Sequence, residues 1–229
     1  MNVGIDGKVI VDEASLIIDG IPIGSAPKPE PPLPYDAEVE YLESTGTQYV
    51  DTGVVPNGAT DIDITYSVAA LTSNNNIALY GCVASGRGFF SGLAIYGTGN
   101  MNMYFINYAD SPVQGLSLAY LSQYRDWTDG TTYHHNNQSA TVTAQTATSL
   151  SMPIFARRNA SGVIERIGTM RVYACKVFSS GTLVRDYIPV RVGTSGYLYD
   201  KANPDGGPLG NGLYPNAGTG AFVIGPDKV

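Results

Sequence analysis

The sequence predicts an all-β protein built as a sandwich of two sheets, and three observations support this fold class. Apolar residues recur at every second position in many short runs, which is the period of a β-strand. The 229 residues include 27 Gly and 16 Tyr, and only 14% are charged, a composition typical of many strands joined by tight turns. No 11-residue window carries a convincing helical stripe.

A hairpin near the end of the chain is expected to organise the fold. Residues 169–178 alternate with apolar side chains on both faces, so we expect this strand to be covered on both sides. Ser179-Ser180-Gly181 supplies a tight turn, and residues 182–187 return as the second strand. Pro189 is expected to end that strand, because a proline cannot donate a hydrogen bond in a central ladder.

The chain is expected to have three parts: an anchoring or oligomerisation arm at residues 1–24, a proline-rich linker at 25–34 and the main domain at 35–229. Five of the ten linker residues are proline, which imposes extended polyproline geometry. The arm is too short for a core of its own, so its apolar residues need a partner unless it is a disordered leader without a role. The predicted anchoring residues are Val9, Ile10, Val11, Leu16, Ile17, Ile18 and Ile21.

From Glu38 onward the strand patterns of the main domain follow one another. Residues 61–70 alternate apolar and polar side chains, as a half-buried strand does. Further strands are expected at residues 77–83, 92–96, 101–106, 139–144, 152–156 and 166–178, the spacing of an antiparallel sandwich. Cys82 and Cys175 lie in such apolar runs, so we expect two buried free thiols and no disulfide.

Segments near both ends of this domain resemble a known family. Residues 40–53 read EYLESTGTQYVDTG, and residues 170–192, MRVYACKVFSSGTLVRDYIPVRV, are followed by GYLYDKANPDGG and LYPNAGTGAFVIGP. These phrases resemble the concanavalin A-like, or laminin-G-like, jelly-roll domains of gut bacterial and phage proteins. The resemblance implies a jelly roll over about residues 37–225. Residues 59–168 match only in rhythm, so the resemblance implies no particular ligand.

The charge and hydropathy of the sequence argue against nucleic acid and membrane insertion. Thirteen basic and 20 acidic residues give a net charge of −7, which is a poor surface for nucleic acid. The first residues show no secretory signal, and no stretch approaches the roughly 20 apolar residues that span a bilayer. We therefore expect a protein that is assembled in the host cytoplasm, released by lysis and displayed on a virion surface. A trimmed extracellular protein is the alternative.

The densest polar and aromatic stretch is residues 124–137. Sugar sites in lectin-like sandwiches combine an aromatic platform with groups that fix hydroxyls. Trp127 is the only tryptophan, and its alternative role is packing. His134 and His135 are adjacent, so on a strand they point to opposite faces and cannot share one metal. The predicted ligand-binding residues are Tyr124, Asp126, Trp127, Asp129, Tyr133 and Asn136.

Two motifs raise enzymatic alternatives. Asp51-Thr52-Gly53 matches the aspartic-protease signature, which requires a second aspartate to share a proton across a dimer axis. Glu38, Glu40 and Glu43 resemble the catalytic strand of jelly-roll glucanases, in which a retaining mechanism needs two carboxyls about 5 Å apart. We expect strand and surface roles for these residues, and we predict no catalytic residue.

Cofactors are not predicted. Asp126 with Asp129, or Asp61 with Asp63, are the weak candidates for holding Ca²⁺, because no dense acidic calcium loop is present. Residues 157–162, which begin with two arginines, are expected to form an exposed hairpin tip.

The predicted function is non-enzymatic. We expect a phage virion surface protein, such as a head fibre, decoration protein or tail-fibre component, that binds host or mucus glycans. Its partners would be glycans, other virion proteins through the arm, and copies of itself, with a trimer expected by analogy to fibres. The alternatives are a jelly-roll glycoside hydrolase, a secreted bacterial carbohydrate-binding module and a purely structural assembly protein.

Overall fold

The computed structural model describes residues 17–18, 21–22, 32–70, 77–84, 87–96, 100–107, 119–141 and 149–229. The chain divides into two units, residues 1–33 and 34–229. In the first unit, β1 (Ile17–Ile18) pairs antiparallel with β2 (Ile21–Pro22). The side chains of the predicted anchoring residues lie outside the described part; these residues are Val9, Ile10, Val11, Leu16, Ile17, Ile18 and Ile21.

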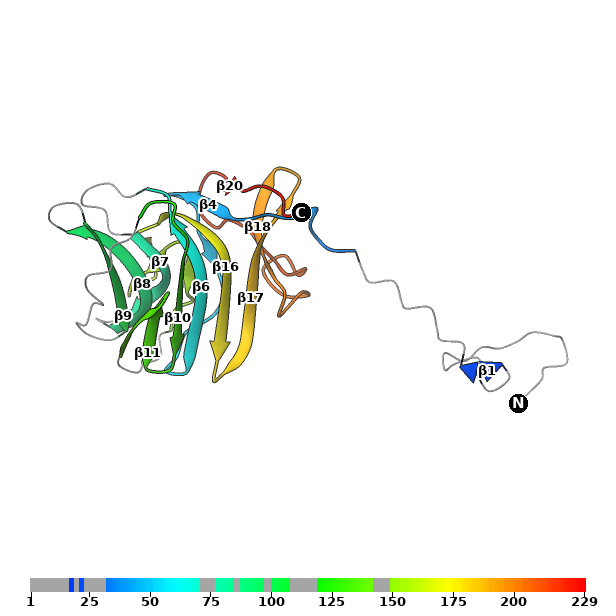
Figure 1. Ribbon diagram of the computed structural model, residues 1–229, viewed down its shortest axis with the longest axis horizontal. Helices are drawn as coiled ribbons and strands as arrows, with labels where there is room; N and C mark the ends of the chain where they lie inside the picture. Colours follow the sequence, from blue (N-terminus) through cyan, green and yellow to red (C-terminus); the bar gives the residue numbers. More distant parts are fainter. Residues whose placement is uncertain are drawn as a thin grey trace. The chain divides into compact units, whose positions relative to one another are not determined.

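Two sheets form the second unit, and the larger has eleven strands among the described residues. Figure 1 shows β10, β6, β16 and β17 of this sheet side by side. Its path runs through β12 (Gln138–Thr141), β11 (Thr132–His135), β10 (Tyr124–Asp129), β6 (Thr60–Val68), β16 (Thr169–Ser179), β17 (Thr182–Val192), β18 (Ser195–Asp200) and β19 (Leu213–Tyr214). The other members are β3 (Ala37–Glu38), which pairs with β17, β4 (Leu42–Thr45), which pairs with β16, and β20 (Val223–Ile224), which pairs with β4.

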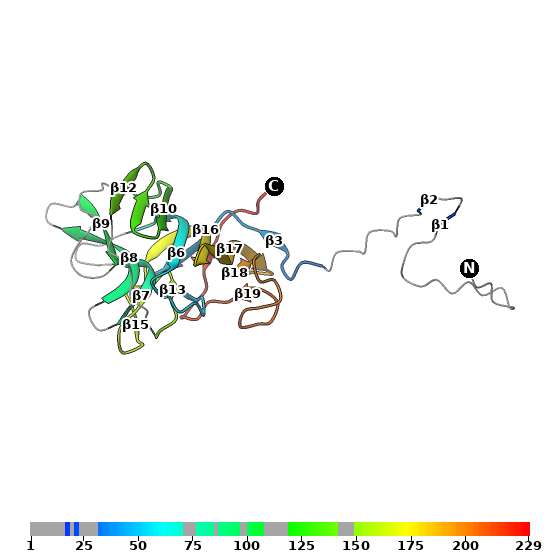
Figure 2. The same ribbon diagram turned by 90° about the horizontal axis from the view of Figure 1, so that it is seen from below.

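The second sheet has seven strands among the described residues and forms a separate layer (Figure 2). Its path runs through β15 (Ile164–Glu165), β14 (Arg157–Arg158), β7 (Ile77–Ala84), β13 (Pro153–Ile154) and β5 (Val50–Asp51). Off this path, β8 (Arg87–Tyr96) pairs with β7 and β9 (Asn100–Asn107) pairs with β8. The predicted all-β jelly-roll sandwich is therefore confirmed. No helix in the described part of the chain is long and apolar enough to cross a membrane.

The expected hairpin of β16 and β17 lies at the centre of the larger sheet, but β16 is not covered on both faces. A β-bulge between Val172 and Ala174 shifts the alternation by one residue. Met170 and Val172 before the bulge, and Cys175 and Val177 after it, therefore share the buried face. If the bulge is ignored and strict alternation is assumed, these four residues are assigned to opposite faces of the strand. Both faces of the strand then look apolar in the sequence.

Strand β17 continues through Pro189 to Val192, so the predicted end at this proline is wrong. The pairing of β17 with β16 stops at Tyr187, and Pro189 then lies opposite Leu198 of β18. The carbonyl oxygen of Pro189 accepts a hydrogen bond from the backbone N–H of Val39. A proline is accommodated here because the side that lacks an N–H no longer faces β16.

The core lies between the two sheets and contains large aromatic side chains. Each fully buried aliphatic or Phe side chain contributes about 1.5–3 kcal/mol to stability. Cys82 and Cys175 are buried and are not joined in a disulfide, as predicted, and burial raises the pKa of the Cys175 thiol. The largest fully buried side chains are Tyr66, Tyr80, Tyr133, Tyr187, Phe89, Phe155, Leu42, Ile62, Ile64 and Leu79.

The segments that carry the family resemblance pack against each other. Ile224 and Val223 of β20 pair with Leu42 and Glu43 of β4. A Cβ on Gly218 would lie 2.0 Å from the carbonyl oxygen of Thr47, so this close approach requires glycine. Residues 40–53 and 213–226, almost at opposite ends of the domain sequence, thus form one structural unit.

Candidate functional site

The predicted ligand-binding residues lie on β10 and β11, but they face both sides of the larger sheet. Asp126 and Tyr133 are fully buried, and Tyr124 packs against the core. Their strand neighbours face outward, where Asp129 is exposed and Trp127 is half-buried. The six residues, which include Asn136 in the turn after β11, are Tyr124, Asp126, Trp127, Asp129, Tyr133 and Asn136. They do not converge on one cavity.

On the inner face, Asp126 is the centre of a buried polar network. Its Oδ1 lies 2.6 Å from Nδ1 of His135, and its Oδ2 accepts a 2.6 Å hydrogen bond from Tyr133. Tyr66 also hydrogen-bonds to this carboxyl. Burial raises the pKa of Asp126 above its ordinary value, although the hydrogen bonds from these partners lower it. Burial also raises the pKa of Tyr66 and Tyr133 well above the ordinary value.

On the outer face, Trp127 stacks on His134, with ring centroids 4.4 Å apart and the planes inclined by 1°. The guanidinium carbon of Arg125 lies 4.8 Å from the indole centroid. Asp63 holds that guanidinium through two hydrogen bonds of 2.9 and 2.7 Å. As predicted, the two adjacent histidines face opposite sides, because His135 is buried in the inner network while His134 stacks on Trp127.

A cavity of about 490 Å³ opens elsewhere in the second unit. One wall comes from the end of β5 and the start of β13, a second from β17, and a third from the loops around β19. Its lining residues are Asp51, Thr52, Gly53, Ser151, Arg185, Gly207, Pro208, Tyr214, Pro215 and Ala217. The volume lies within the range of about 300–1,000 Å³ that is usual for small-molecule sites. Tyr214, two prolines and an alanine give it apolar surface beside its polar groups.

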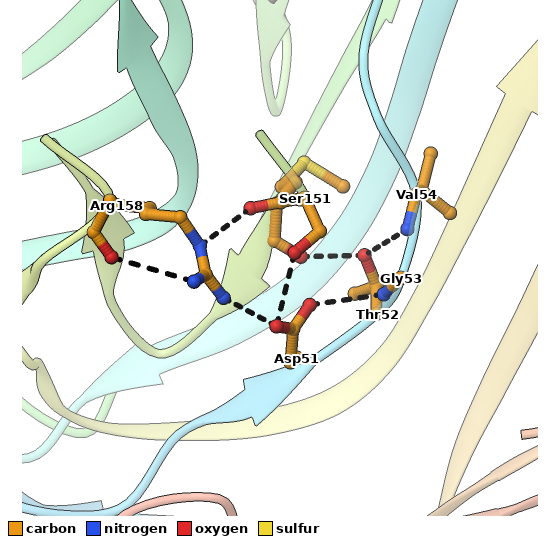
Figure 3. Close-up of polar contacts among 8 residues, drawn as sticks. Asp51, Thr52, Gly53, Val54, Ser151 and Arg158 are labelled. Carbon is orange, nitrogen blue, oxygen red and sulfur yellow. Dashed lines mark hydrogen bonds and ion pairs between the residues drawn. The ribbon is translucent and has the colours of Figure 1, made fainter. Parts of the chain in front are cut away.

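The first wall is a rigid turn around Asp51 (Figure 3). Arg158 forms an ion pair with the Asp51 carboxylate, and Ser151 donates a 3.0 Å hydrogen bond to its Oδ2. The backbone N–H of Gly53, which has a φ of +66°, donates to Oδ1. The Thr52 hydroxyl donates to the carbonyl oxygen of Met152 across the sheet. These contacts fix the direction of the Asp51 carboxylate, which remains 36% exposed at the cavity.

The second wall contributes Arg185 of β17, which lies opposite the buried Val177 of β16. Its Nη1 donates a 2.7 Å hydrogen bond to the carbonyl oxygen of Val184. Its Nε lies 3.5 Å from Oδ2 of the fully buried Asp200, and neither atom has a hydrogen bond within the described residues. Oδ1 of Asp200 accepts hydrogen bonds from the backbone N–H groups of Asp186 and Ala202. The ion pair therefore anchors Arg185 at the wall.

Tyr187 and Tyr214 join these two walls. Their rings meet edge to face, with centroids 5.0 Å apart, and the Tyr187 hydroxyl donates a 3.4 Å hydrogen bond to the carbonyl oxygen of Thr52. A Cβ on Gly207 would lie 2.8 Å from the Tyr214 ring, and Gly207 has a φ of +76°. The loop can therefore close over Tyr214 only with glycine at this position.

The enzymatic alternatives find little geometric support. Asp51 is ion-paired with Arg158, whereas an aspartic protease requires two carboxyls that share a proton. Glu43 pairs with Arg171, and Glu38 lies 3.7 Å from Nζ of Lys228. The residues of the glucanase alternative, Glu38, Glu40 and Glu43, do not line the cavity.

The weak calcium candidates are engaged by protein groups. Asp61 accepts a 2.8 Å hydrogen bond from the backbone N–H of Gly130, and Asp129 lies 3.2 Å from Nε2 of His134. Asp63 pairs with Arg125, and Asp126 belongs to the buried network. In the described residues, no three His, Cys, Asp or Glu side chains gather as metal ligands would.

The chain shows a weak likeness to a solved structure. No family model matches the chain, and no curated protein matches it. Among solved structures, the native heptameric SAP-like pentraxin from Limulus polyphemus matches with a TM-score of 0.47 and 10% sequence identity. The match covers 84% of this chain and 96% of the pentraxin chain.

The sequence does not predict the cavity. Asp51-Thr52-Gly53 stands out as a motif, but its pattern suggests a different chemistry. Ser151, Arg185 and Tyr214 carry no local signal that separates them from ordinary strand and turn residues. The cavity also involves both ends of the domain, since Asp51 and Tyr214 belong to the two segments that carry the family resemblance.

Proposed function

We propose that this protein is a phage virion surface protein whose jelly-roll unit binds host or mucus glycans without catalysis. The observation that carries the glycan part is the cavity beside Asp51. It combines a fixed carboxylate, a hydroxyl and a guanidinium with the apolar surface of Pro208, Pro215 and Ala217. Carbohydrates offer hydroxyls to polar groups and C–H faces to aromatic or apolar walls, so this combination suits a saccharide.

Asp51 is well suited to hydrogen-bond a sugar hydroxyl. An ionised carboxylate offers about four acceptor positions, and Asp51 uses three of them, for Arg158, Ser151 and the N–H of Gly53. The remaining acceptor position is on Oδ1, and Asp51 is one of the residues that line the cavity. Because the carboxylate is held by its neighbours, little side-chain entropy would be lost when a ligand binds.

Binding is best tested with a cavity-filling variant. Ala217 is an exposed residue of the cavity wall, so Ala217→Trp would block the space without disturbing the core. We expect wild type to give signals on a glycan array and Ala217→Trp to lose them. Val223→Trp, at an exposed position of β20 that does not line the cavity, is the matched control and should bind as wild type does.

Anchoring in a virion is supported by the division of the chain into two units, residues 1–33 and 34–229, and by the proline-rich linker. We expect the arm to bind other virion proteins or further copies of the chain, with a trimer as the oligomer. A particle assembled with the chain lacking residues 1–34 should contain little of the protein. Normal incorporation would contradict the anchoring role, and glycan binding without any particle association would favour a secreted carbohydrate-binding module.

A further inference from the structure

Two arginines lie at or next to the cavity, and they differ in how their N–H groups are used. Each of the three side-chain nitrogens of Arg158 has an acceptor: the Asp51 carboxylate and the carbonyl oxygens of Ser151 and Gly162. Arg185 differs, since its Nη2 makes no hydrogen bond within the described residues while its side chain is 22% exposed at the cavity wall. The guanidinium is thus positioned by Val184 and Asp200, and its Nη2 group has no hydrogen-bond acceptor in the described part of the chain.

Local charge does not oppose an acidic ligand. The charges of Asp51 and Arg158 cancel, as do those of Arg185 and Asp200. A carboxylate that enters the cavity therefore meets no local excess of negative charge, although the whole chain carries −7. A hydrogen bond between a guanidinium and a carboxylate is roughly twice as strong as a neutral one, so the free Nη2 gains most from an anionic acceptor.

We infer that the cavity selects saccharides that carry a carboxylate, such as uronic or sialic acids, through Arg185. This inference rests on the proposed glycan binding. The ligand carboxylate accepts from Nη2 of Arg185, and Asp51 accepts from a ligand hydroxyl. Asp200 acts as a positioning residue, because its two backbone hydrogen bonds fix the carboxylate that holds Nε of Arg185.

Matched sugar pairs test the selection. Titration calorimetry of the full chain would compare glucuronic acid with glucose, and galacturonic acid with galactose, since each pair differs only in its C6 carboxylate. We expect the acid to bind at least about tenfold more tightly than the neutral sugar, as one charge-assisted hydrogen bond provides. Ala217→Trp should abolish binding of all four sugars, which assigns the binding to the cavity.

Variants at Arg185 separate recognition from folding. Arg185→Gln alone would leave Asp200 buried without a cation, so the double variant Arg185→Gln/Asp200→Asn removes both charges together. Its thermal unfolding serves as the control for folding. We expect the double variant to lose the preference for acids, so that glucuronic acid and glucose bind with equal affinity, and Arg185→Lys to keep part of the preference.

Each further outcome has a distinct meaning. Neutral and acidic sugars that bind equally, both blocked by Ala217→Trp, would overturn the acid selection and leave glycan binding in place. Retention of the acid preference in the folded double variant would overturn the role of Arg185. Absence of binding by every sugar and by the glycan array would overturn the proposed function and this inference together.

Discussion

Asp126 and Asp51 are both centres of polar networks, yet one network is closed and the other is open. Asp126 is fully buried, and its oxygens are taken by His135, Tyr133 and Tyr66. Asp51 has a cationic partner and a hydroxyl donor as well, but it borders a cavity of about 490 Å³. The Asp126 carboxyl is therefore surrounded by packed side chains, whereas the Asp51 carboxylate borders free space.

The difference shows that residue types alone do not identify a site. The stretch from Tyr124 to Asn136 is the densest cluster of polar and aromatic residues in the sequence, but Asp126, Tyr133 and His135 in it are buried. The residues around Asp51 are sparse in the sequence and converge only in the fold. Space next to a partly satisfied polar group is the better criterion for a binding site.

The largest effect is expected at the closed network. Asp126→Ala leaves His135, Tyr133 and Tyr66 without their buried acceptor, so the free energy of unfolding should fall by about 3–5 kcal/mol. Urea denaturation measures this change. Asp129→Ala, on the outward-facing side of the same strand, should change stability by less than about 0.5 kcal/mol. Equal losses in the two variants would contradict the contrast between the faces.

The closed network should also respond to pH. Because burial raises the pKa of Asp126 above its ordinary value of 3.8, the folded state binds this proton more tightly than the unfolded state. This contribution to stability is fully present below pH 3.8 and is lost as pH rises through the folded-state pKa. Among the titratable neighbours of Asp126 are His135, Tyr133, Tyr66 and Tyr80.

The measurement is the difference in unfolding free energy between wild type and Asp126→Asn as a function of pH. The advantage of wild type should shrink as pH increases from 3 toward neutrality, because only wild type has the proton to lose. A difference that grows with pH would show that the carboxylate form is the stabilising one, with His135 as its cation.

The open network should respond in binding more than in stability. Asp51→Asn weakens a partly exposed ion pair with Arg158, so unfolding should change by only about 1 kcal/mol, while glycan binding should be lost. Glu165→Gln is the matched control, because Glu165 pairs with Arg157 in the same sheet without lining the cavity. It should lose similar stability and keep binding. Loss of binding in both variants would point to a general effect on the sheet.

Trp127→Ala tests the outer face, with a smaller expected effect. The variant removes stacking on His134 and the contact with Arg125, which together contribute about 1 kcal/mol. Glycan-array signals should remain equal to those of wild type. If Trp127→Ala abolishes binding and Ala217→Trp does not, the outer face of β10 and β11 is the glycan site and the cavity is not.

The smallest effect is expected from the arm. Residues 34–229 form a unit of their own, so a chain that lacks residues 1–33 should unfold with the same free energy, within about 0.5 kcal/mol. Denaturation of the full and shortened chains measures this difference. A clear loss of stability would show that the arm packs on the jelly roll and would weaken its assignment as an anchor.

Several features follow from the sequence because they depend on neighbouring residues. The alternation in β6, the hairpin of β16 and β17 and the opposite directions of His134 and His135 all arise from the pleat of a single strand. The same rule places Asp126 and Trp127 on opposite faces. The predicted ligand-binding set could therefore have been divided in two before the structure was known.

Other features depend on what the rest of the chain places nearby. The bulge after Val172 and the continuation of β17 through Pro189 follow from their strand partners. Arg157 and Arg158, expected at an exposed turn, belong to β14, where Glu165 and Asp51 pair with them.

The sequence by itself determined the fold class, the buried thiols and the central hairpin, because the alternation of apolar and polar side chains can be recognised within each short segment. Only the tertiary structure decided the cavity. Asp51 and Ser151, 100 positions apart, meet there with Arg185 and Tyr214. Free space between side chains is a property of how both sheets close at one edge, and no segment of the sequence encodes that closure alone.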